Sequence, residues 1–358
     1  MRKILLLGGT ALVAGMLVAV MTLFVSHPVR SNGLDTATPV TVVSDLASSA
    51  SILLAPSATP SPTSTSTATP VPPTATPAPP TATPTPAAPV KTGSAPPPNI
   101  QSVSIAVVDE GSGALLYGRD PHRQMAPASL TKIFTALVAL KYGDINQQVH
   151  VQFDQSQLVD STLMGLKEGD TFSLEDLLYG LLLPSGNDSA LAIANAVGGN
   201  EDHFVAMMNA EAQDLGLHDS HFVNPHGLDA PSHYSSAYDL AMASRYGMTH
   251  YPEFRKIVGT KAYQVHGSRT FWVYNLNRLL PNYPGADGVK IGYTDNAGHT
   301  IVGSATRNGH RVYVALMECS DTLGDTVPLF NWVFANYTWP ANAPLSAGVT
   351  PTPTPAHA

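Results

Sequence analysis

A serine and a lysine stand three residues apart at the start of an apolar segment, as Ser129 and Lys132 of "PASLTKIF". On one helix this spacing places the two Cβ atoms about 5 to 6 Å apart, so the hydroxyl and the amine come within hydrogen-bonding reach. Such a serine becomes a nucleophile when the lysine has a lowered pKa. The alternative interpretation is structural, with Ser129 as a helix N-cap and Lys132 extending its charge into water.

The helix that carries this pair is predicted to be buried almost all round. Between residues 124 and 140, Lys132 is the only ionisable side chain, and apolar residues recur with helical spacing. A lone lysine on a buried helix costs free energy unless it is paired or used in chemistry. Partners elsewhere in the chain therefore decide between the two interpretations.

A second serine follows a long apolar run in "LLLPSGND", where Ser185 and Asn187 stand in a turn after Pro184. In the functional interpretation, Ser185 passes a proton to a leaving amine, and Asn187 holds a substrate amide and the Lys132 amine. In the structural interpretation, Ser185 and Asp188 form a helix capping box.

A second lysine lies on a predicted strand in "DGVKIGYT", as Lys290. Close to Lys132, a second cation would disfavour the protonated form of the first and make Lys132 a usable base. Gly292 would let a substrate backbone approach the strand. By itself, a lysine on a strand is usually solvated.

These residues must be positioned by a single domain, predicted to be α+β. "SVSIAVVDEGSGALLYGRD" indicates a β-hairpin, and the middle of the chain, up to about residue 251, has a helical pattern. Three strands and a closing helix are predicted after it, at about 288–293, 300–306, 311–318 and 324–337. Strands at both ends with helices inserted between them favour one antiparallel sheet.

The ends of the chain have a different composition. Arg2 and Lys3 precede about 22 uncharged residues, which is long enough to cross a bilayer, so we expect residues 1–26 to form a transmembrane signal-anchor or, if cleaved, a signal peptide. Residues 27–98 and 341–358 are expected to be a disordered spacer and tail because proline and threonine dominate much of them. The domain at 99–340 is therefore expected outside the cytoplasm, anchored to the membrane or secreted.

Charge and residue counts exclude several classes of function. Four of the 18 basic residues and two of the 26 acidic residues precede residue 99, so the domain carries a formal net charge of −10, which argues against a nucleic-acid partner. The single cysteine, Cys319, is predicted to be a core residue. The 13 histidines include no His-Glu-x-x-His pattern, so no metal site is predicted.

The three elements Ser-x-x-Lys, Ser-x-Asn and Lys-x-Gly, in this order, resemble the penicillin-recognising serine enzymes. With "DLLYGLLLPSGNDSALAIA", "NPHGLD" and "VKIGYTDNAGH", the chain is similar to the low-molecular-weight penicillin-binding proteins of the D-alanyl-D-alanine carboxypeptidase family over about residues 101–333. The resemblance implies a β-lactamase/transpeptidase-like fold with an inserted helical subdomain. It also implies removal of the terminal D-alanine from peptidoglycan stem peptides, with β-lactams as inhibitors and no cofactor.

The resemblance also implies a role for each matching residue. Ser129 would be the nucleophile, Lys132 the general base, Ser185 the proton relay, Asn187 a ligand of the substrate amide and Lys290 a source of positive potential for the substrate carboxylate. Substrate-binding residues would be Ile291, Gly292, Tyr293, Thr294 and Arg307, with the backbone N–H groups of Ser129 and Tyr293 forming the oxyanion hole.

One residue departs from the family pattern, because Ile291 replaces the usual threonine of Lys-Thr-Gly. A literal Lys-Thr-Gly occurs at residues 91–93, but we interpret it as chance because it precedes the nucleophile. The Ile291 substitution favours one alternative, a weakly active or non-catalytic domain that only binds penicillin or peptidoglycan. A serine β-lactamase is the other, but the glutamate it would need near His221 is missing between Glu211 and Glu253.

Overall fold

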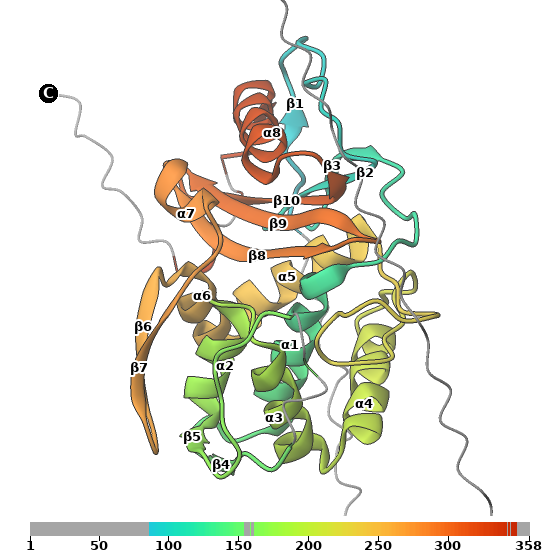
Figure 1. Cartoon of the computed structure of the whole chain (residues 1–358). Coiled ribbons are helices and arrows are strands. Elements are labelled where there is room, and N and C mark those ends of the chain that lie inside the picture. The colour runs from blue at the N-terminus through green and yellow to red at the C-terminus, as the bar shows by residue number, and fades with distance from the viewer. Residues whose placement is uncertain (1–85, 154–157, 159–160, 342, 344, 349–358) are drawn as a thin grey trace, which may run out of the picture. The chain divides into compact units, whose positions relative to one another are not determined.

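A five-stranded antiparallel sheet forms the centre of the domain (Figure 1). The computed structural model describes residues 86–153, 158, 161–341, 343 and 345–348, and the expected N-terminal anchor lies outside these residues. The strand order is β3-β2-β10-β9-β8. The bounds are β2 (Ser104–Asp109), β3 (Leu115–Arg119), β8 (Ala286–Thr294), β9 (Gly298–Arg307) and β10 (His310–Cys319). The predicted hairpin and the three predicted strands after the helices are confirmed.

Both faces of the sheet are covered. Along β2, Ala106 and Val108 point into the core shared with the helical region, while Ile105 and Val107 pack toward helix α8 (Thr322–Asn336). Figure 1 shows α8 on one side of the sheet and most of the other helices on the opposite side. The central strands are therefore apolar on both faces, as layered α+β folds require.

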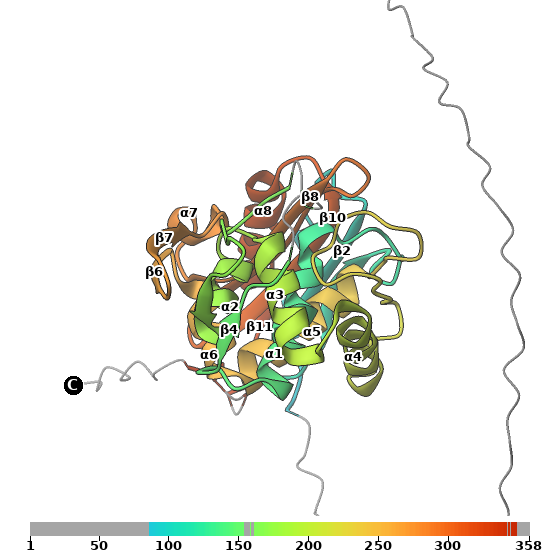
Figure 2. The same ribbon diagram turned by 60° about the horizontal axis from the view of Figure 1, so that its bottom comes forward.

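The helical part of the chain is inserted between β3 and β8. It contains α1 (Thr131–Tyr142), α2 (Leu174–Leu182), α3 (Asn187–Gly198), α4 (Glu201–Asp214), α5 (Ala237–His250), α6 (Pro252–Gly259) and α7 (Leu279–Asn282). Nine successive residues of α1, from Thr131 to Ala139, are buried, so the expectation of a helix buried all round is confirmed. Figure 2 shows α1 with α2, α3 and α4 arranged beside it.

Two small two-stranded antiparallel sheets lie in the helical part and were not anticipated from the sequence. One is β4 (Gln148–His150) with β5 (Thr171–Ser173), and the other is β6 (Ala262–His266) with β7 (Thr270–Tyr274). The β6–β7 hairpin lies at the edge of the domain in both overall views (Figures 1 and 2).

The described fold extends beyond the expected bounds 99–340 at both ends. Strand β1 (Val90–Lys91) pairs with β11 (Tyr337–Thr338), which places the literal Lys-Thr-Gly of residues 91–93 next to the end of α8. Near the C-terminus, Ser346 is buried, and the carbonyl of Ala347 accepts hydrogen bonds from Arg311. Composition did not reveal these contacts because each depends on only a few residues.

Candidate active site

Ser129 lies in a short 3-10 turn, Ala128–Leu130, that leads directly into α1. Its side chain is half-buried and lines a cavity of about 780 Å³. The preceding residue, Ala128, has φ of 50°, in the left-handed region that costs free energy for a residue with a Cβ. A strained backbone next to a serine in a cavity is typical of a catalytic nucleophile.

Lys132 lies one turn further along and is completely buried. Its Nζ is 3.0 Å from Ser129 Oγ, 2.6 Å from Asn187 Oδ1 and 2.6 Å from the carbonyl oxygen of His226. Burial, together with the positive charge of Lys290, holds the pKa of Lys132 well below its usual value, although the Asp188 carboxylate acts in the opposite direction. The interpretation in which Lys132 extends into water is therefore wrong.

These three contacts determine what a neutral Lys132 can do. The Asn187 and His226 oxygens can only accept hydrogen bonds, so they take both hydrogens of a neutral amine. The lone pair of the nitrogen is then directed toward Ser129 Oγ, 3.0 Å away. Lys132 is thus arranged to accept the proton of the Ser129 hydroxyl.

Ser185 lies in the turn that precedes α3, and Asn187 is the first residue of that helix. The N-cap residue of α3 is Gly186, and no side chain caps this helix, so the capping interpretation of Ser185 is wrong. Ser185 has φ of 66°, and its buried Oγ has no hydrogen-bond partner among the described residues. A buried, unpaired hydroxyl in the wall of the cavity is available for a ligand.

Asp188 holds this turn in place. Its carboxylate accepts hydrogen bonds from the backbone N–H groups of Met164, Gly165 and Leu166, each at 2.8 to 2.9 Å. The loop that contains Thr162 is thereby tied to α3, and Thr162 donates a hydrogen bond to the carbonyl of Ser185 at 2.7 Å. Asp188 therefore positions the second serine rather than acting in the chemistry.

Strand β8 lies at the edge of the sheet and passes close to Ser129. A Cβ on Gly292 would come within 2.8 Å of the backbone nitrogen of Ser129, so only glycine allows this approach. Lys290 is 1% exposed, donates a hydrogen bond to the carbonyl of Ile291, and has its pKa lowered by burial to about 7. Tyr293 lines the same cavity.

The expected carboxylate-binding residues separate into two groups. Ile291 and Thr294 line the cavity, but the Thr294 hydroxyl already donates to Asp229 at 2.9 Å. Arg307 does not line it: its guanidinium donates to Asn331 and Tyr283, on the side of the sheet that α8 covers. The expectation for Arg307 was therefore wrong. Ile291 pairs with Ile301 of β9, and Arg307 lies six residues further along that strand.

The sequence interpretation missed two features of the cavity. Arg278 lines it, is exposed, and has no side-chain partner among the described residues. The second feature is the backbone turn at His226 and Gly227, which supplies an acceptor to Lys132. The arginine near the strand motif was a sequence signal that could have been used. The carbonyl of His226 gave no such signal, because every residue has a backbone carbonyl.

Two histidines near this turn, half-buried His226 and buried His233, have lowered pKa values and are expected to be neutral at pH 7. Burial lowers the pKa of His226 to about 3 and that of His233 to about 4. The Nδ1 atom of His233 accepts a hydrogen bond from the Val223 N–H, so its Nε2 carries the hydrogen that faces Thr131 Oγ1, at 2.8 Å. Thr131 in turn donates to the carbonyl of Ala128, which braces the strained residue before Ser129.

The described residues give little support to a β-lactamase-type glutamate, a metal site or a cysteine nucleophile. The carboxylates that line the cavity belong to Asp229 and Asp295, with no glutamate among them. No cluster of three or more metal-ligating side chains occurs in the described part of the chain. Cys319 is buried, which raises the pKa of its thiol to about 12 and agrees with its prediction as a core residue.

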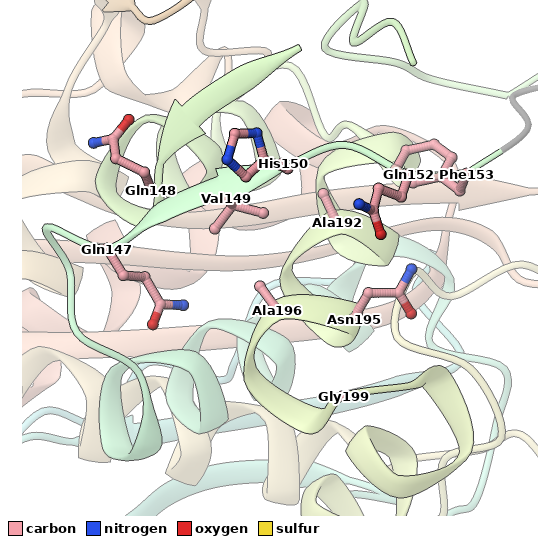
Figure 3. A pocket seen from close by; sticks show the side chains of 10 residues that line it. All are labelled: Gln147, Gln148, Val149, His150, Gln152, Phe153, Ala192, Asn195, Ala196 and Gly199. Atoms are coloured by element: carbon pink, nitrogen blue, oxygen red, sulfur yellow. The ribbon is translucent and has the colours of Figure 1, made fainter. Parts of the chain in front are cut away.

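A second cavity of about 520 Å³ lies between β4 and the C-terminal half of α3 (Figure 3). Amide side chains surround it, from Gln147, Gln148, Gln152 and Asn195. None of the predicted site residues lines it, so the chemistry is assigned to the cavity around Ser129.

Within residues 86–153, 158, 161–341, 343 and 345–348, no helix combines the length and the apolar character that crossing a membrane would take.

Comparison with known proteins gives a consistent match. Residues 90–321 match the family model for D-alanyl-D-alanine carboxypeptidase, peptidase family S11. The chain is 32% identical to the D-alanyl-D-alanine carboxypeptidase DacF of Bacillus subtilis over 66% of this chain and 63% of that protein. It is 39% identical to DacB2 of Mycobacterium tuberculosis, over 64% of this chain and 81% of the relative. The match to DacF thus spans less than two thirds of that protein.

A solved structure shows the same fold. The DD-transpeptidase of Streptomyces K15 is 32% identical, with a TM-score of 0.64, over 67% of this chain and 100% of the other. The expected fold class, with an antiparallel sheet and flanking helices, is confirmed.

Proposed function

Because the chain belongs to the D-alanyl-D-alanine carboxypeptidase family, we propose that it removes the terminal D-alanine from peptidoglycan stem peptides through an acyl-enzyme on Ser129. The observation that supports this most is the environment of Lys132. Its Nζ lies 3.0 Å from Ser129 Oγ, with both of its other contacts being acceptors, and its pKa is lowered. A buried amine so arranged is a general base next to a nucleophile.

In the first half of the reaction, Ser129 Oγ attacks the carbonyl carbon of the penultimate D-alanine while its proton moves to Lys132. The negative oxygen that forms is stabilised by the backbone N–H groups of Ser129 and Tyr293. The bond to the terminal D-alanine then breaks, and its amine leaves with a proton passed through the unpaired hydroxyl of Ser185. An ester on Ser129 remains.

In the second half, water attacks the ester carbonyl, gives its proton to a basic group of the site, and releases the shortened peptide and Ser129. Among the described residues, no glutamate lines the cavity to speed this step. The missing glutamate argues against the β-lactamase alternative. We therefore expect a penicillin to form a long-lived ester on Ser129.

The substrate carboxylate needs a cation, and Arg278 is the best placed to bind it directly. It lines the cavity, and its guanidinium, which has no partner among the described residues, can hold a carboxylate through two parallel hydrogen bonds. Lys290, a buried residue of β8, contributes positive potential when protonated. We assign to Arg278 the role that Arg307 was expected to fill.

The proposed substrate lies outside the cytoplasm, so we also propose that the domain acts there. The uncharged segment that follows Arg2 and Lys3 supports either membrane anchoring or secretion. Fractionation of cells that express the full chain would separate these two outcomes, and a cytoplasmic pool alone would contradict both.

The proposal is tested by incubating the domain with benzylpenicillin and measuring its mass. We expect one covalent adduct on Ser129 and none on the Ser129→Ala variant, whose circular dichroism should be unchanged because little packing is lost. D-alanine release from diacetyl-L-Lys-D-Ala-D-Ala separates an active enzyme from a domain that only binds penicillin. An adduct on Ser185 would mean that the nucleophile is misassigned.

A further inference from the structure

The β6–β7 hairpin has one buried face and one face without a partner among the described residues. On the buried face, Tyr263 stacks on Tyr179 of α2, and Phe271 packs against Phe172 of β5. Val265 and Val273 are also buried there. Because side chains alternate along a strand, the residues between them must point outward.

The outward face carries two large aromatic side chains. Trp272 is 54% exposed and Tyr274 is 62% exposed. Gln264 stands opposite Trp272 in the neighbouring strand, and Ala262 stands opposite Tyr274. The small alanine leaves the tyrosine ring uncovered, and neither ring contacts another ring among the described residues. We call these four residues the aromatic face.

The hairpin is fixed in place at both ends. Near its tip, the Ser268 N–H donates to the carbonyl of Thr171, and the Arg269 guanidinium pairs with Asp170. At its base, the amide of Asn275 donates to the carbonyls of Val258 and Thr260. A rigid surface loses little conformational entropy when a ligand binds to it.

The aromatic face leads into the cavity around Ser129. Leu276 and Arg278 continue the alternation of Trp272 and Tyr274, and both line that cavity. The Leu276 N–H donates to the carbonyl of Leu183, directly before the turn that carries Ser185. Four extended residues span at most about 14 Å, so Trp272 lies within that distance of Leu276. The aromatic face therefore lies a few residues along the chain from side chains that line the cavity.

From this continuity we propose that the aromatic face binds a sugar ring of the glycan strand whose stem peptide occupies the cavity. Aromatic rings offer a flat apolar surface to the C–H face of a pyranose, while the Gln264 amide can hydrogen-bond its hydroxyls. The outward positions of the two strands, which also include His266 and Thr270, hold no lysine or arginine. A face that bound anionic lipid would be expected to carry such cations. The choice of glycan rests on the proposed function.

The test compares two substrates on the full domain. For the double variant Trp272→Ala/Tyr274→Ala, we expect kcat/KM to fall about 10-fold on a glycan strand bearing pentapeptides and to stay unchanged on diacetyl-L-Lys-D-Ala-D-Ala. Tyr142→Ala is the matched control, since Tyr142 is also 54% exposed but lies at the end of α1. It should leave both rates unchanged. An equal loss on both substrates, or no loss on either, would overturn the proposal.

A binding measurement keeps this inference separate from the proposed function. Calorimetry with peptide-free glycan oligosaccharides should give heat with the wild-type protein and with Ser129→Ala, and none with the double variant. If the protein cleaves neither substrate, the proposed function fails, while this titration still decides the role of the face. Absence of heat with the wild type, or binding to phosphatidylglycerol vesicles that the double variant loses, would overturn the glycan assignment.

Discussion

Gly227 lies so close to Ala128 that a Cβ on residue 227 would be 2.0 Å from the carbonyl oxygen of Ala128. This contact joins the turn that provides an acceptor for Lys132 to the strained residue that precedes Ser129. Two parts of the site that are almost 100 residues apart in the sequence therefore depend on one missing side chain.

We expect Gly227→Ala to slow acylation by benzylpenicillin by at least about 100-fold, because the clash must move either Ser129 or the acceptor of Lys132. Gly216→Ala is the matched control: Gly216 also has a positive φ, of 70°, but a Cβ there would meet nothing within 4 Å. Both variants suffer backbone strain, and only the first has the clash. Equal acylation rates in the two would show that this contact has no catalytic importance.

The pH dependence of acylation follows from the two buried lysines. Burial and Lys290 hold the pKa of Lys132 below 10.5, and burial lowers that of Lys290 to about 7. Lowering the pH protonates Lys132 and removes its lone pair, so the acylation rate should rise with pH through a limb well below 10.5. His226 and His233, with pKa values of about 3 and 4, should add no limb near 6.5.

Stopped-flow acylation by a fluorescent penicillin across pH measures this limb. Lys132→Arg should be inactive at every pH, since a guanidinium does not give up its proton. Full activity in the arginine variant would exclude Lys132 as the base.

Arg278 and Arg307 form a pair that tests the carboxylate assignment. Arg278→Gln should lower kcat/KM on a D-alanyl-D-alanine peptide by about 10- to 150-fold, since a hydrogen bond to a charged group is lost. Arg307→Gln should leave it unchanged, because Arg307 contacts Tyr283 and Asn331 instead. On a peptide amidated at its C-terminus, which has no carboxylate, the two variants should have the same kcat/KM. The reverse ranking of the two arginines would restore the assignment made from sequence.

Ile291→Thr should accelerate the enzyme. The isoleucine lines the cavity without offering a hydrogen-bond donor, and threonine keeps the β-branched shape that suits β8. We expect kcat/KM on the peptide and the rate of penicillin acylation to rise by about 10- to 150-fold. Unchanged or slower acylation would mean that the carboxylate gains nothing from a hydroxyl at position 291 beyond its contact with Arg278.

The buried ion pair between Glu110 and Arg311 should be important for stability. The two side chains are 2% and 3% exposed, and their charged atoms are 2.7 Å apart. Arg311→Leu leaves the Glu110 carboxylate buried without its cation, so the free energy of unfolding in urea should fall by about 3 to 5 kcal/mol. Glu110→Leu/Arg311→Leu should recover part of that loss. A double variant less stable than Arg311→Leu would contradict this explanation.

How far the sequence could predict the structure depends on the kind of interaction. The burial of α1 and the Ser129–Lys132 contact were predictable, since both arise from spacing along one helix. The position of Arg307 was not, because it depends on how far β9 extends beyond the residues paired with β8. The β6–β7 hairpin alternates between buried and exposed positions, but exposed Trp272 and Tyr274 hide that alternation, since both look like core residues.

The pairing of β1 with β11 has a mechanical consequence. A force applied to the chain at Val90 would first load the short ladder between residues 90–91 and 337–338 and the hydrogen bonds from Thr92 and Gly93 to the carbonyl of Asn336. The five-stranded sheet that carries β8 is a separate hydrogen-bonded unit. We therefore expect the hydrogen bonds of this ladder to break under tension before the sheet beside the cavity around Ser129 is deformed.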